Sequence, residues 1–291
     1  MGHKISLFEK AANLFYGASG NNQFRHHKGY HYPRSLQTIN MIRNNGVRFE
    51  QDYGFCLRDI PHNYYGIAES SSIMDSGIYE KIFPELESIT TIPSEFKHLS
   101  SIYKTKESLI DIDPIIKYFN CLLQDNIHFN SELKTSEYSN YDIVVDCTNN
   151  SNHSLDLLQK KYKLYIMEKI ILKAPIFSLT VMDGDFFSIY PYSIDNHLYS
   201  LSHVKYSDLS LEVSEKERLE HILESADYFI DSFSSKFRNI GNFIGLKNFN
   251  KQVKDASRLL EYTMKDNVLS FSISKILSIY EIEDKLIEIL L

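Results

Sequence analysis

The side chains best suited to chemistry gather in one run near the start of the sequence, SGNNQFRHHKGYHYPRS, which spans residues 19–35. His26, His27 and His31 supply imidazoles that titrate near neutrality, so each could move a proton, bind a metal ion or hold a ligand. Three kinds of site match this mixture of histidine, arginine, amide and tyrosine side chains. They are a metal site, a nucleic-acid surface and the lining of a cofactor pocket.

A metal site matches the spacing poorly. The adjacent His26 and His27 point in different directions, and no H-E-x-x-H pattern places two histidines on one helix face. Cys56, Cys121 and Cys147 are far apart and form no C-x-x-C pair, which argues against a structural zinc site and a disulfide framework. We therefore expect no metal ion, and reduced thiols as in a cytoplasmic protein.

Charge argues against the nucleic-acid surface. The 291 residues carry a formal net charge of −7, so the chain has no general attraction to a polyanion. The 43% hydrophobic composition is enough for a large buried core. No run approaches the roughly 18 apolar residues of a membrane helix, and no signal peptide is evident. We expect a cytoplasmic protein that binds a small-molecule substrate and neither nucleic acid nor membrane.

The elements around the cluster predict how it is positioned. The apolar run HKISLFEK predicts a buried parallel strand that ends at Glu9. Pro33 is expected to begin a helix that ends before Gly46. Residues 101–110 predict a further strand, and Asp113 is expected to cap the helix after it. Two more strand-like runs follow, in an order typical of an α/β lobe.

The second half has a different pattern. Strand-like runs between residues 165 and 206, separated by turn signals such as Asp183-Gly184, predict an antiparallel sheet. Amphipathic helices are expected over 214–233 and 276–291. No linker rich in proline and glycine divides the chain, so we expect two lobes that exchange segments.

Short motifs give weaker signals. An acid at the end of the second strand of a dinucleotide-binding unit accepts hydrogen bonds from ribose hydroxyls, and Glu9 could be this acid or a solvated charge. The glycine fingerprint should precede that acid by roughly 20 residues, but only eight residues precede Glu9. GASGNN lacks the Lys-Ser/Thr of a P-loop, and SISK at 272–275 matches S-x-x-K without its companion motifs.

Three blocks together resemble a known family. GHKISLFEK, GASGNNQFRHHKGYHYPRS and YDIVVDCTN are similar, in residues and spacing, to the FAD-dependent oxidoreductases of the D-amino-acid oxidase and L-2-hydroxyglutarate dehydrogenase superfamily. Members read G-x-x-V-x-L-x-E-K, then a small or hydroxyl residue, Asn, and H-x-G-x-x-Y. The resemblance covers the first third and the YDIVVDCT strand well, the region 165–206 in pattern, and the C-terminus loosely.

The resemblance implies roles for residues at the cofactor, which would be FAD. Glu9 would hold the ribose, Ser19 and Asn22 would approach the diphosphate or ring, and Gln23 would line the ring edge. Thr148, at the end of its strand, would also contact the cofactor.

The same resemblance implies the residues of the chemistry. His27 would stand in H-x-G-x-x-Y with Gly29 and Tyr32, close to the flavin ring and the substrate. There it could take the proton of the substrate heteroatom, or act only as a structural histidine beneath the cofactor.

Three further residues are candidates for the substrate pocket: Tyr190, Tyr192 and His203. Aromatic residues on a sheet also serve as core. At two positions the family has glycine and this sequence does not. Asn149, after Thr148, tolerates the positive φ of its position, and Ser274 stands before the last helix.

The implied fold class is α/β, with a Rossmann-like FAD-binding lobe, N-terminally truncated, interleaved with an antiparallel-sheet substrate lobe. The FAD-binding lobe is expected over residues 1–62, 100–164 and 262–291, and the substrate lobe over 63–99 and 165–261. The first strand and its G-x-G-x-x-G turn are missing before Glu9, so the chain is expected to be a truncated member.

The implied function is oxidation of a small amino- or hydroxy-acid-like substrate by hydride transfer to flavin. Two alternatives stay open. One is a non-catalytic remnant of the fold that cannot retain flavin. The other is a nucleotide-sugar enzyme with a similar lobe, because a ribose-binding acid does not distinguish a cofactor from a substrate nucleotide.

Overall fold

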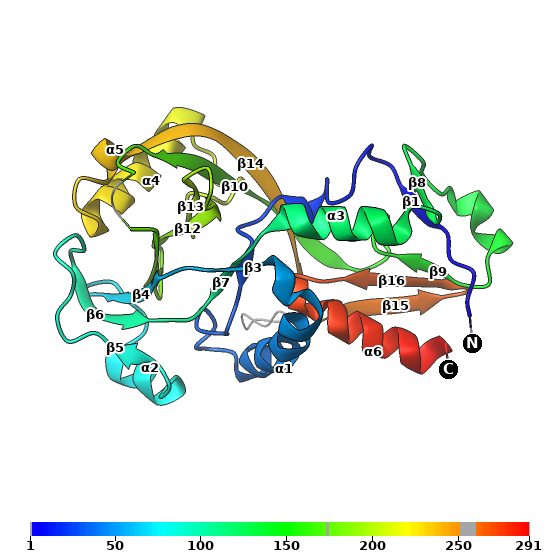
Figure 1. Cartoon of the computed structure of the whole chain (residues 1–291), viewed down its shortest axis with the longest axis horizontal. Helices are drawn as coiled ribbons and strands as arrows, with labels where there is room; N and C mark the ends of the chain where they lie inside the picture. Colours follow the sequence, from blue (N-terminus) through cyan, green and yellow to red (C-terminus); the bar gives the residue numbers. More distant parts are fainter. Residues whose placement is uncertain (1, 173–174, 251–259, 291) are drawn as a thin grey trace.

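The computed structural model describes residues 2–172, 175–250 and 260–290. Figure 1 shows an elongated molecule with a large sheet at one end and short strands with helices at the other. Two long neighbouring strands, β10 (Leu157–Lys169) and β14 (Phe237–Asn250), run between these ends. Segments far apart in the sequence make up each end, as expected for interleaved lobes.

The large sheet has eight strands within the described residues. β4 pairs with β11 in parallel, with Tyr64 opposite Leu179, and the other neighbours are antiparallel. The strands expected between residues 165 and 206 pair antiparallel, as predicted. The sheet as a whole is mixed, because β4 comes from the first part of the chain and adds one parallel pair. In spatial order the strands are β14, β10, β13 (Leu198–His203), β12 (Phe187–Ser193), β11 (Phe177–Met182), β4 (His62–Ala68), β6 (Leu99–Lys104) and β5 (Glu87–Ser88).

Short parallel pairs form the opposite end of the molecule. β1 (Leu7–Glu9) pairs with β8 (Ile127–Phe129), and β9 (Val144–Asp146) pairs with β16 (Val268–Ser272). β16 also pairs antiparallel with β15 (Glu261–Lys265). Among the residues that the structure describes, β1 and β9 each have a strand along one edge only.

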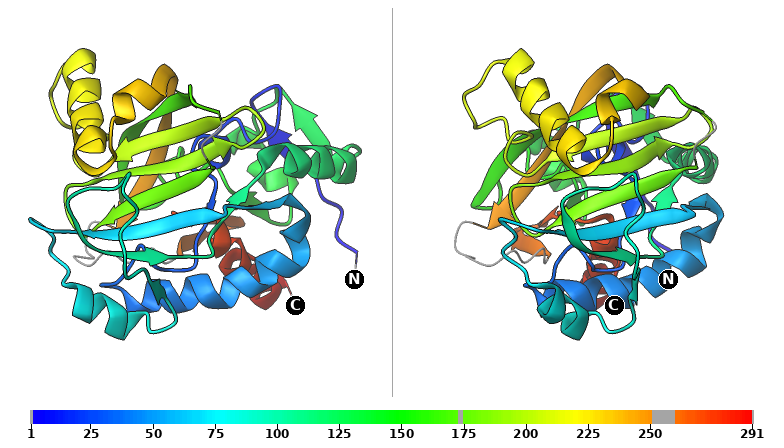
Figure 2. Two further views of the ribbon diagram at one scale, coloured as in Figure 1. Left: turned by 60° about the vertical axis from the view of Figure 1, so that its left-hand side comes forward. Right: turned by 90° about the vertical axis from the view of Figure 1, so that its left-hand side faces the viewer.

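Helices cover both faces of the large sheet (Figure 2). α4 and α5 lie on one face, and α1 and α2 lie on the other. None of the helices within the described ranges is long and apolar enough to cross a membrane. The helices are α1 (Leu36–Tyr53), α2 (Ser76–Ile82), α3 (Ile112–Leu123), α4 (Glu215–Phe229), α5 (Phe233–Lys236) and α6 (Ile279–Leu290).

The core consists of two clusters separated by the large sheet. Alternate residues of one strand enter different clusters, as Tyr64 and Tyr65 of β4 do. Tyr64 joins the cluster beneath α4, which contains Ile222 and Phe229. Tyr65 joins the cluster around α1 and residues 24–32, so the histidine-rich run is packed directly on the sheet.

Helix α1 differs from its prediction at Gly46. The helix continues through Gly46 for two more turns, to Tyr53, and begins from the side chain of Ser35, which accepts a bond from the Thr38 N–H. The extra turns bury Phe49 against the ring of His26, with centroids 5.4 Å apart. This packing outweighs the poor helix propensity of glycine.

Two other local predictions need correction. The segment 101–110 is not one strand, because β6 ends at Lys104 and β7 (Ser108–Ile110) belongs to a different sheet. The cap of α3 is Asp111, whose carboxylate accepts a bond from the Asp113 N–H, and is not Asp113 itself. The break between β6 and β7 places Glu107 beneath the histidine-rich run.

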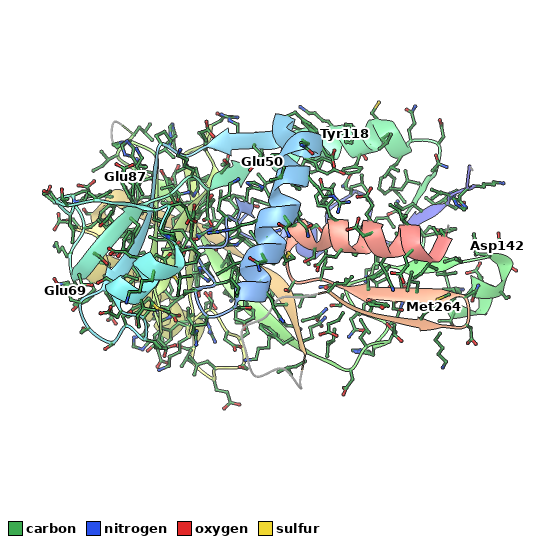
Figure 3. The ribbon with its side chains drawn as sticks, turned by 90° about the horizontal axis from the view of Figure 1, so that it is seen from below. Glu50, Glu69, Glu87, Tyr118, Asp142 and Met264 are labelled. Carbon is green, nitrogen blue, oxygen red and sulfur yellow. The ribbon has the colours of Figure 1, made fainter. Side chains whose placement is uncertain are left out.

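Helix α6, near the end of the sequence, contacts α1 from its first part. Figure 3 shows α6 running alongside β15 and β16, near the labelled Met264, with α1 crossing close to its start. Arg48 of α1 donates to both carboxylate oxygens of Asp284 at 2.9 Å, and the Tyr280 hydroxyl donates to Asp52 at 2.8 Å. These contacts fix the loop before α6, which contains Lys275, relative to α1.

Candidate functional site

A small sheet holds the histidine-rich run in place. β2 (Arg25–His26) and β3 (Leu57–Asp59) both pair antiparallel with β7. The carbonyl of Phe24 accepts a further bond from the Ile110 N–H at 2.7 Å. The backbone on either side of Arg25 is therefore fixed by β7, and the Arg25 side chain is buried.

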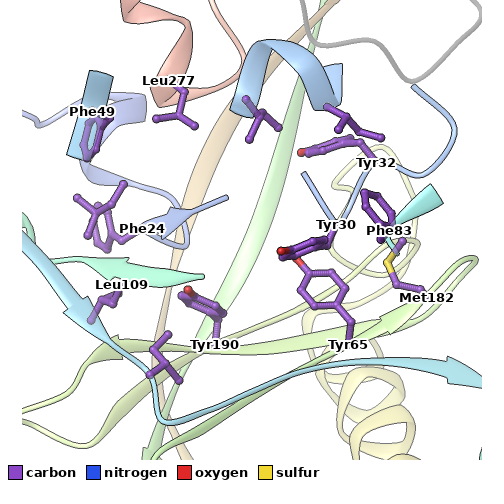
Figure 4. Close-up of a cluster of buried hydrophobic side chains, with 14 of the residues drawn as sticks. Phe24, Tyr30, Tyr32, Phe49, Tyr65, Phe83, Leu109, Met182, Tyr190 and Leu277 are labelled. Carbon is purple, nitrogen blue, oxygen red and sulfur yellow. The ribbon is translucent and has the colours of Figure 1, made fainter. Parts of the chain in front are cut away.

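Arg25 is the centre of a buried polar network. Its guanidinium donates to the Tyr65 hydroxyl at 3.0 Å and to the hydroxyls of Thr180 and Ser188 at 2.8 Å each. It also lies 4.1 Å from the ring centroid of Tyr190. Figure 4 shows Tyr65 and Tyr190 projecting from the sheet toward the residues of the run. The Arg25 guanidinium thus connects the histidine-rich run to strands β4, β11 and β12 of the large sheet.

Glu107 balances the charge of Arg25. One carboxylate oxygen lies 3.7 Å from the Arg25 guanidinium and accepts the Tyr65 hydroxyl at 2.8 Å, and the other accepts the Lys28 N–H at 3.0 Å. Neither charged side chain exposes more than 2% of its surface. Burial lowers the pKa of Arg25, but Tyr65 and Glu107 outweigh it, and the net pKa is raised. The pair is therefore a buried ion pair in which both groups carry charge.

His27 lies between an anion and a cation. Its Nδ1 is 3.5 Å from a Glu107 oxygen, and its Nε2 is 3.3 Å from Nζ of Lys275. Its ring lies 6.0 Å from that of His31 and 5.8 Å from that of Tyr32. Lys275 is in turn 4.6 Å from the Tyr32 ring centroid. The structure brings together side chains that are about 240 residues apart in the sequence.

Both histidines of this cluster are neutral at pH 7. Burial, followed by the charges of Lys275 and Arg25, lowers the pKa of His27 well below its ordinary value of 6.5. Burial, followed by the charges of Arg25 and His27, lowers the pKa of His31 in the same direction. A neutral imidazole has a lone pair that can accept a proton, which an imidazolium lacks.

The H-x-G-x-x-Y segment makes a tight turn. Gly29 has φ +97°, a conformation that side chains rarely adopt, and its carbonyl accepts the Tyr32 N–H at 2.9 Å. The Tyr32 carbonyl then accepts the Ser35 N–H at 3.0 Å, and Ser35 caps α1. The turn thus leads directly into the helix and places Tyr32 beside His27.

Ser19, Asn22 and Gln23 lie in the loop before this turn. The Asn22 amide donates to the carbonyl of Ser19 at 2.8 Å and its oxygen accepts the Phe24 N–H at 2.6 Å, so Asn22 shapes the loop. Gln23 reaches the Ser202 hydroxyl on β13 at 3.2 Å. The loop passes close to β14, where a Cβ on Gly245 would come within 2.7 Å of a loop carbonyl oxygen.

Glu9 and Thr148 lie at the ends of two different parallel strands. One Glu9 oxygen accepts the Ala11 N–H at 2.8 Å, and the Thr148 N–H donates to Asp146 at 2.9 Å. Asn149 adopts φ +58°, the positive value expected for its position. The structure places these residues at β1 and β9, each of which has a strand along one edge only among the residues described.

The three pocket candidates on the large sheet lie in different surroundings. Tyr190 is fully buried, and its hydroxyl donates to the Ser108 carbonyl at 2.9 Å. Tyr192 packs between Phe24 and Phe243. The roles of both residues in a substrate pocket stay predictions.

His203 is not part of the cluster around His27. Its Nδ1 accepts the N–H groups of Lys205 and Tyr206 at 3.1 and 3.3 Å, so it closes a local turn. Burial lowers the pKa of His203 to about 4, with smaller effects from Asp185, Lys205 and His221. Its charged neighbours are not those of His27.

Sequence analysis missed three residues of the site: Arg25, Glu107 and Lys275. Arg25 stands inside the run but has no distinctive spacing, and Glu107 lies between two short strands. Lys275 is the last residue of SISK, whose resemblance to a catalytic motif is fortuitous. Its proximity to His27 depends on the fold alone.

Several buried polar atoms at the site have no hydrogen-bond partner among the described residues. They are Nδ1 of His27, Nδ1 of His31, Nε of Arg25 and the hydroxyl of Ser274. Buried polar atoms are nearly always hydrogen-bonded in native proteins. Their concentration here fits a site that receives a polar ligand.

Comparison with known proteins gives the fold. No family model matches the chain. The chain is 26% identical to the FAD-dependent monooxygenase FPY4 of Fusarium mangiferae. The alignment spans 223 residues and covers 72% of this chain and 60% of that protein. It is 31% identical to the FAD-dependent monooxygenase kojA of Aspergillus flavus. This second alignment spans 119 residues and covers 38% of this chain and 28% of that protein. The chain thus spans less than two thirds of these relatives.

Solved structures match nearly the whole chain. Glycine oxidase from Geobacillus kaustophilus aligns with a TM-score of 0.67 at 9% identity, over 95% of this chain and 84% of that chain. L-α-glycerophosphate oxidase from Mycoplasma pneumoniae, solved with FAD bound, aligns with a TM-score of 0.67 at 11% identity, over 94% and 84%. The chain therefore shares the fold of these two oxidases, one of which was solved with FAD bound. L-proline dehydrogenase from P. horikoshii shares it at a TM-score of 0.63 and 10% identity, over 93% and 81%.

This fold is the one that the resemblance drawn from the sequence motifs implied. The site residues themselves stay predictions, because similarity at 9 to 12% identity defines the arrangement of elements and not the roles of side chains.

Proposed function

We propose that this chain belongs to an FAD-dependent oxidoreductase that oxidises a small amino- or hydroxy-acid-like substrate by hydride transfer to flavin. The observation that carries the proposal is a neutral, largely buried His27, 3.5 Å from a buried carboxylate, within a fold shared with FAD-dependent oxidases. When bound, FAD supplies the acceptor for the hydride from the substrate C–H.

His27 would take the proton from the substrate heteroatom. Its lowered pKa keeps the imidazole unprotonated before the reaction. Glu107, 3.5 Å from Nδ1, would stabilise the imidazolium once the proton has arrived. The protein thus supplies a base of fixed orientation, with its counter-charge already in place.

The cofactor would lie along the loop and the two parallel strand ends. Glu9 would accept hydrogen bonds from the ribose, and Ser19, Gln23 and Thr148 would approach the diphosphate or ring. Asn22 would act by holding the loop in shape. The unsatisfied hydroxyl of Ser274 supports this placement, since a polar ligand atom would complete its hydrogen bonding.

We further propose that a glycine-rich strand–turn–helix lies between β1 and β9 in the flavin-binding form. Both strands are parallel to their single partners, and parallel strands are normally covered on both sides. An added parallel strand would join the two small sheets and bring a helix N-terminus toward the diphosphate. The unpaired edges equally favour the alternative, that the chain as it stands is a remnant that cannot retain flavin.

Anaerobic reduction of the flavin tests the proposed function. We expect at least one amino or hydroxy acid from a panel to bleach the flavin of the flavin-binding form, which carries the added strand–turn–helix, when no nicotinamide cofactor is present. Bleaching that needs NADH or NADPH for every compound would contradict direct oxidation of such a substrate. It would favour a reaction of the kind named for the two fungal monooxygenases.

A further inference from the structure

Lys275 lies in the loop between β16 and α6, far from the histidine-rich run in sequence. Its Nζ approaches Nε2 of His27 to 3.3 Å and lies 4.6 Å from the centre of the Tyr32 ring. The loop is fixed at both ends, because Leu269 of β16 is buried and the Ser278 N–H donates to the Lys275 carbonyl at 3.1 Å. The Lys275 ammonium is therefore held over the face of the Tyr32 ring and at the edge of the His27 ring.

The position of Lys275 determines how His27 can use its two nitrogens. An ammonium group only donates, so Nε2 of His27 must accept, and the imidazole proton then lies on Nδ1. Nδ1 faces the Glu107 carboxylate at 3.5 Å, where an N–H is favourable. The charges of Lys275 and Glu107, on opposite sides of His27, therefore favour the same tautomer, with the proton on Nδ1.

We propose that Lys275 is a positioning residue that fixes the tautomer of His27 and suppresses its protonation until a substrate is bound. The proposal rests on the proposed role of His27 as the proton acceptor, but the effect of Lys275 on His27 does not depend on flavin. A positive charge within about 4 to 6 Å of a histidine disfavours the imidazolium by roughly 1 to 3 pKa units. Any group that draws the ammonium away from Nε2 would raise the basicity of His27.

Other charged and titratable groups also face His27. Glu107 favours the imidazolium, whereas Lys275 and the cations of β2 and β14 oppose it. Tyr32 and His31 are in ring contact with His27, and burial lowers the pKa of His31 well below its ordinary value. Among the residues that the structure describes, these groups include Arg25, His26, His31, Tyr32, Glu107, Lys247 and Lys275.

Titration of the His27 imidazole by nuclear magnetic resonance, in the chain without flavin, tests the proposal. The His27 signals are assigned by their loss in His27→Gln. We expect Lys275→Met to raise the pKa of His27 by about one unit or more, and Lys275→Arg to keep it low because the charge is retained. Lys216→Met is the matched control, since Lys216 is 85% exposed on α4.

An unchanged His27 pKa in Lys275→Met would overturn the proposal, as would an equal rise in Lys275→Arg and Lys275→Met. If Lys275→Met fails to fold, Lys275→Gln makes the same test with a polar side chain. Failure of the proposed function gives a different result, in which the His27 pKa responds to Lys275 but no amino or hydroxy acid reduces the flavin.

Discussion

Replacing His27 with alanine in the flavin-binding form, which carries a strand–turn–helix between β1 and β9, is expected to slow reduction of bound flavin by substrate by roughly 10² to 10⁴-fold, the usual contribution of a general base. His27 is the neutral imidazole closest to Glu107 and Lys275, and alanine removes the proton acceptor. The measurement is the anaerobic rate of flavin bleaching at saturating substrate. Flavin content should not change, because the role proposed for His27 is in proton transfer and not in holding the cofactor.

His203→Ala is the matched control for this prediction. His203 is also a buried histidine whose pKa is lowered, to about 4, but its Nδ1 only accepts bonds within the 203–207 turn. We expect this variant to reduce flavin at the normal rate. Equal rates of flavin reduction in His27→Ala and the unmodified protein would show that His27 is structural. A slower rate in His203→Ala alone would show that His27 is not the proton acceptor.

Arg25→Met is expected to lower the free energy of unfolding by about 3 to 5 kcal/mol, the usual cost of breaking a buried ion pair by removing one partner. The substitution leaves Glu107 buried without its counter-charge, and it removes donors from Tyr65, Thr180 and Ser188. Denaturant unfolding followed by circular dichroism measures the change. The size of the loss reflects the complete burial of both groups.

Two comparisons separate charge from packing in this result. Arg34 forms a surface pair with Asp183 and has a side chain that is 56% exposed, so Arg34→Met should cost less than about 1 kcal/mol. Adding Glu107→Gln to Arg25→Met should recover part of the loss, because no unpaired charge then remains. A loss no greater in Arg25→Met than in Arg34→Met would contradict the buried network described here.

The sequence predicts the parts of the site that are local. His27, Gly29 and Tyr32 lie within six residues of the sequence, and the resemblance to H-x-G-x-x-Y implied that they lie together. The strand that ends at Glu9 follows from its apolar run. Helix α1 was predicted to be too short because a glycine at position 46 normally indicates an end, whereas burial of Phe49 decides the boundary.

The parts that depend on distant contacts could not be predicted. Lys275 meets His27 across 248 positions, and only the path of β16 and α6 brings it there. Strand β14 was missed because its sequence, FRNIGNFIGLKNFN, is rich in asparagine and glycine, which have low strand propensity. Its pairing with β10 along 13 positions outweighs that propensity.

The flavin content of two purified forms tests the central claim most directly. One form is the chain of 291 residues, and the other is the same chain preceded by a strand–turn–helix with a G-x-G-x-x-G turn. We predict that the extended form retains FAD and shows the visible flavin band, whereas the chain of 291 residues is colourless. A colourless extended form would contradict assignment as a flavin-dependent oxidoreductase. A yellow 291-residue chain would contradict the proposal that a strand between β1 and β9 is needed to hold the cofactor.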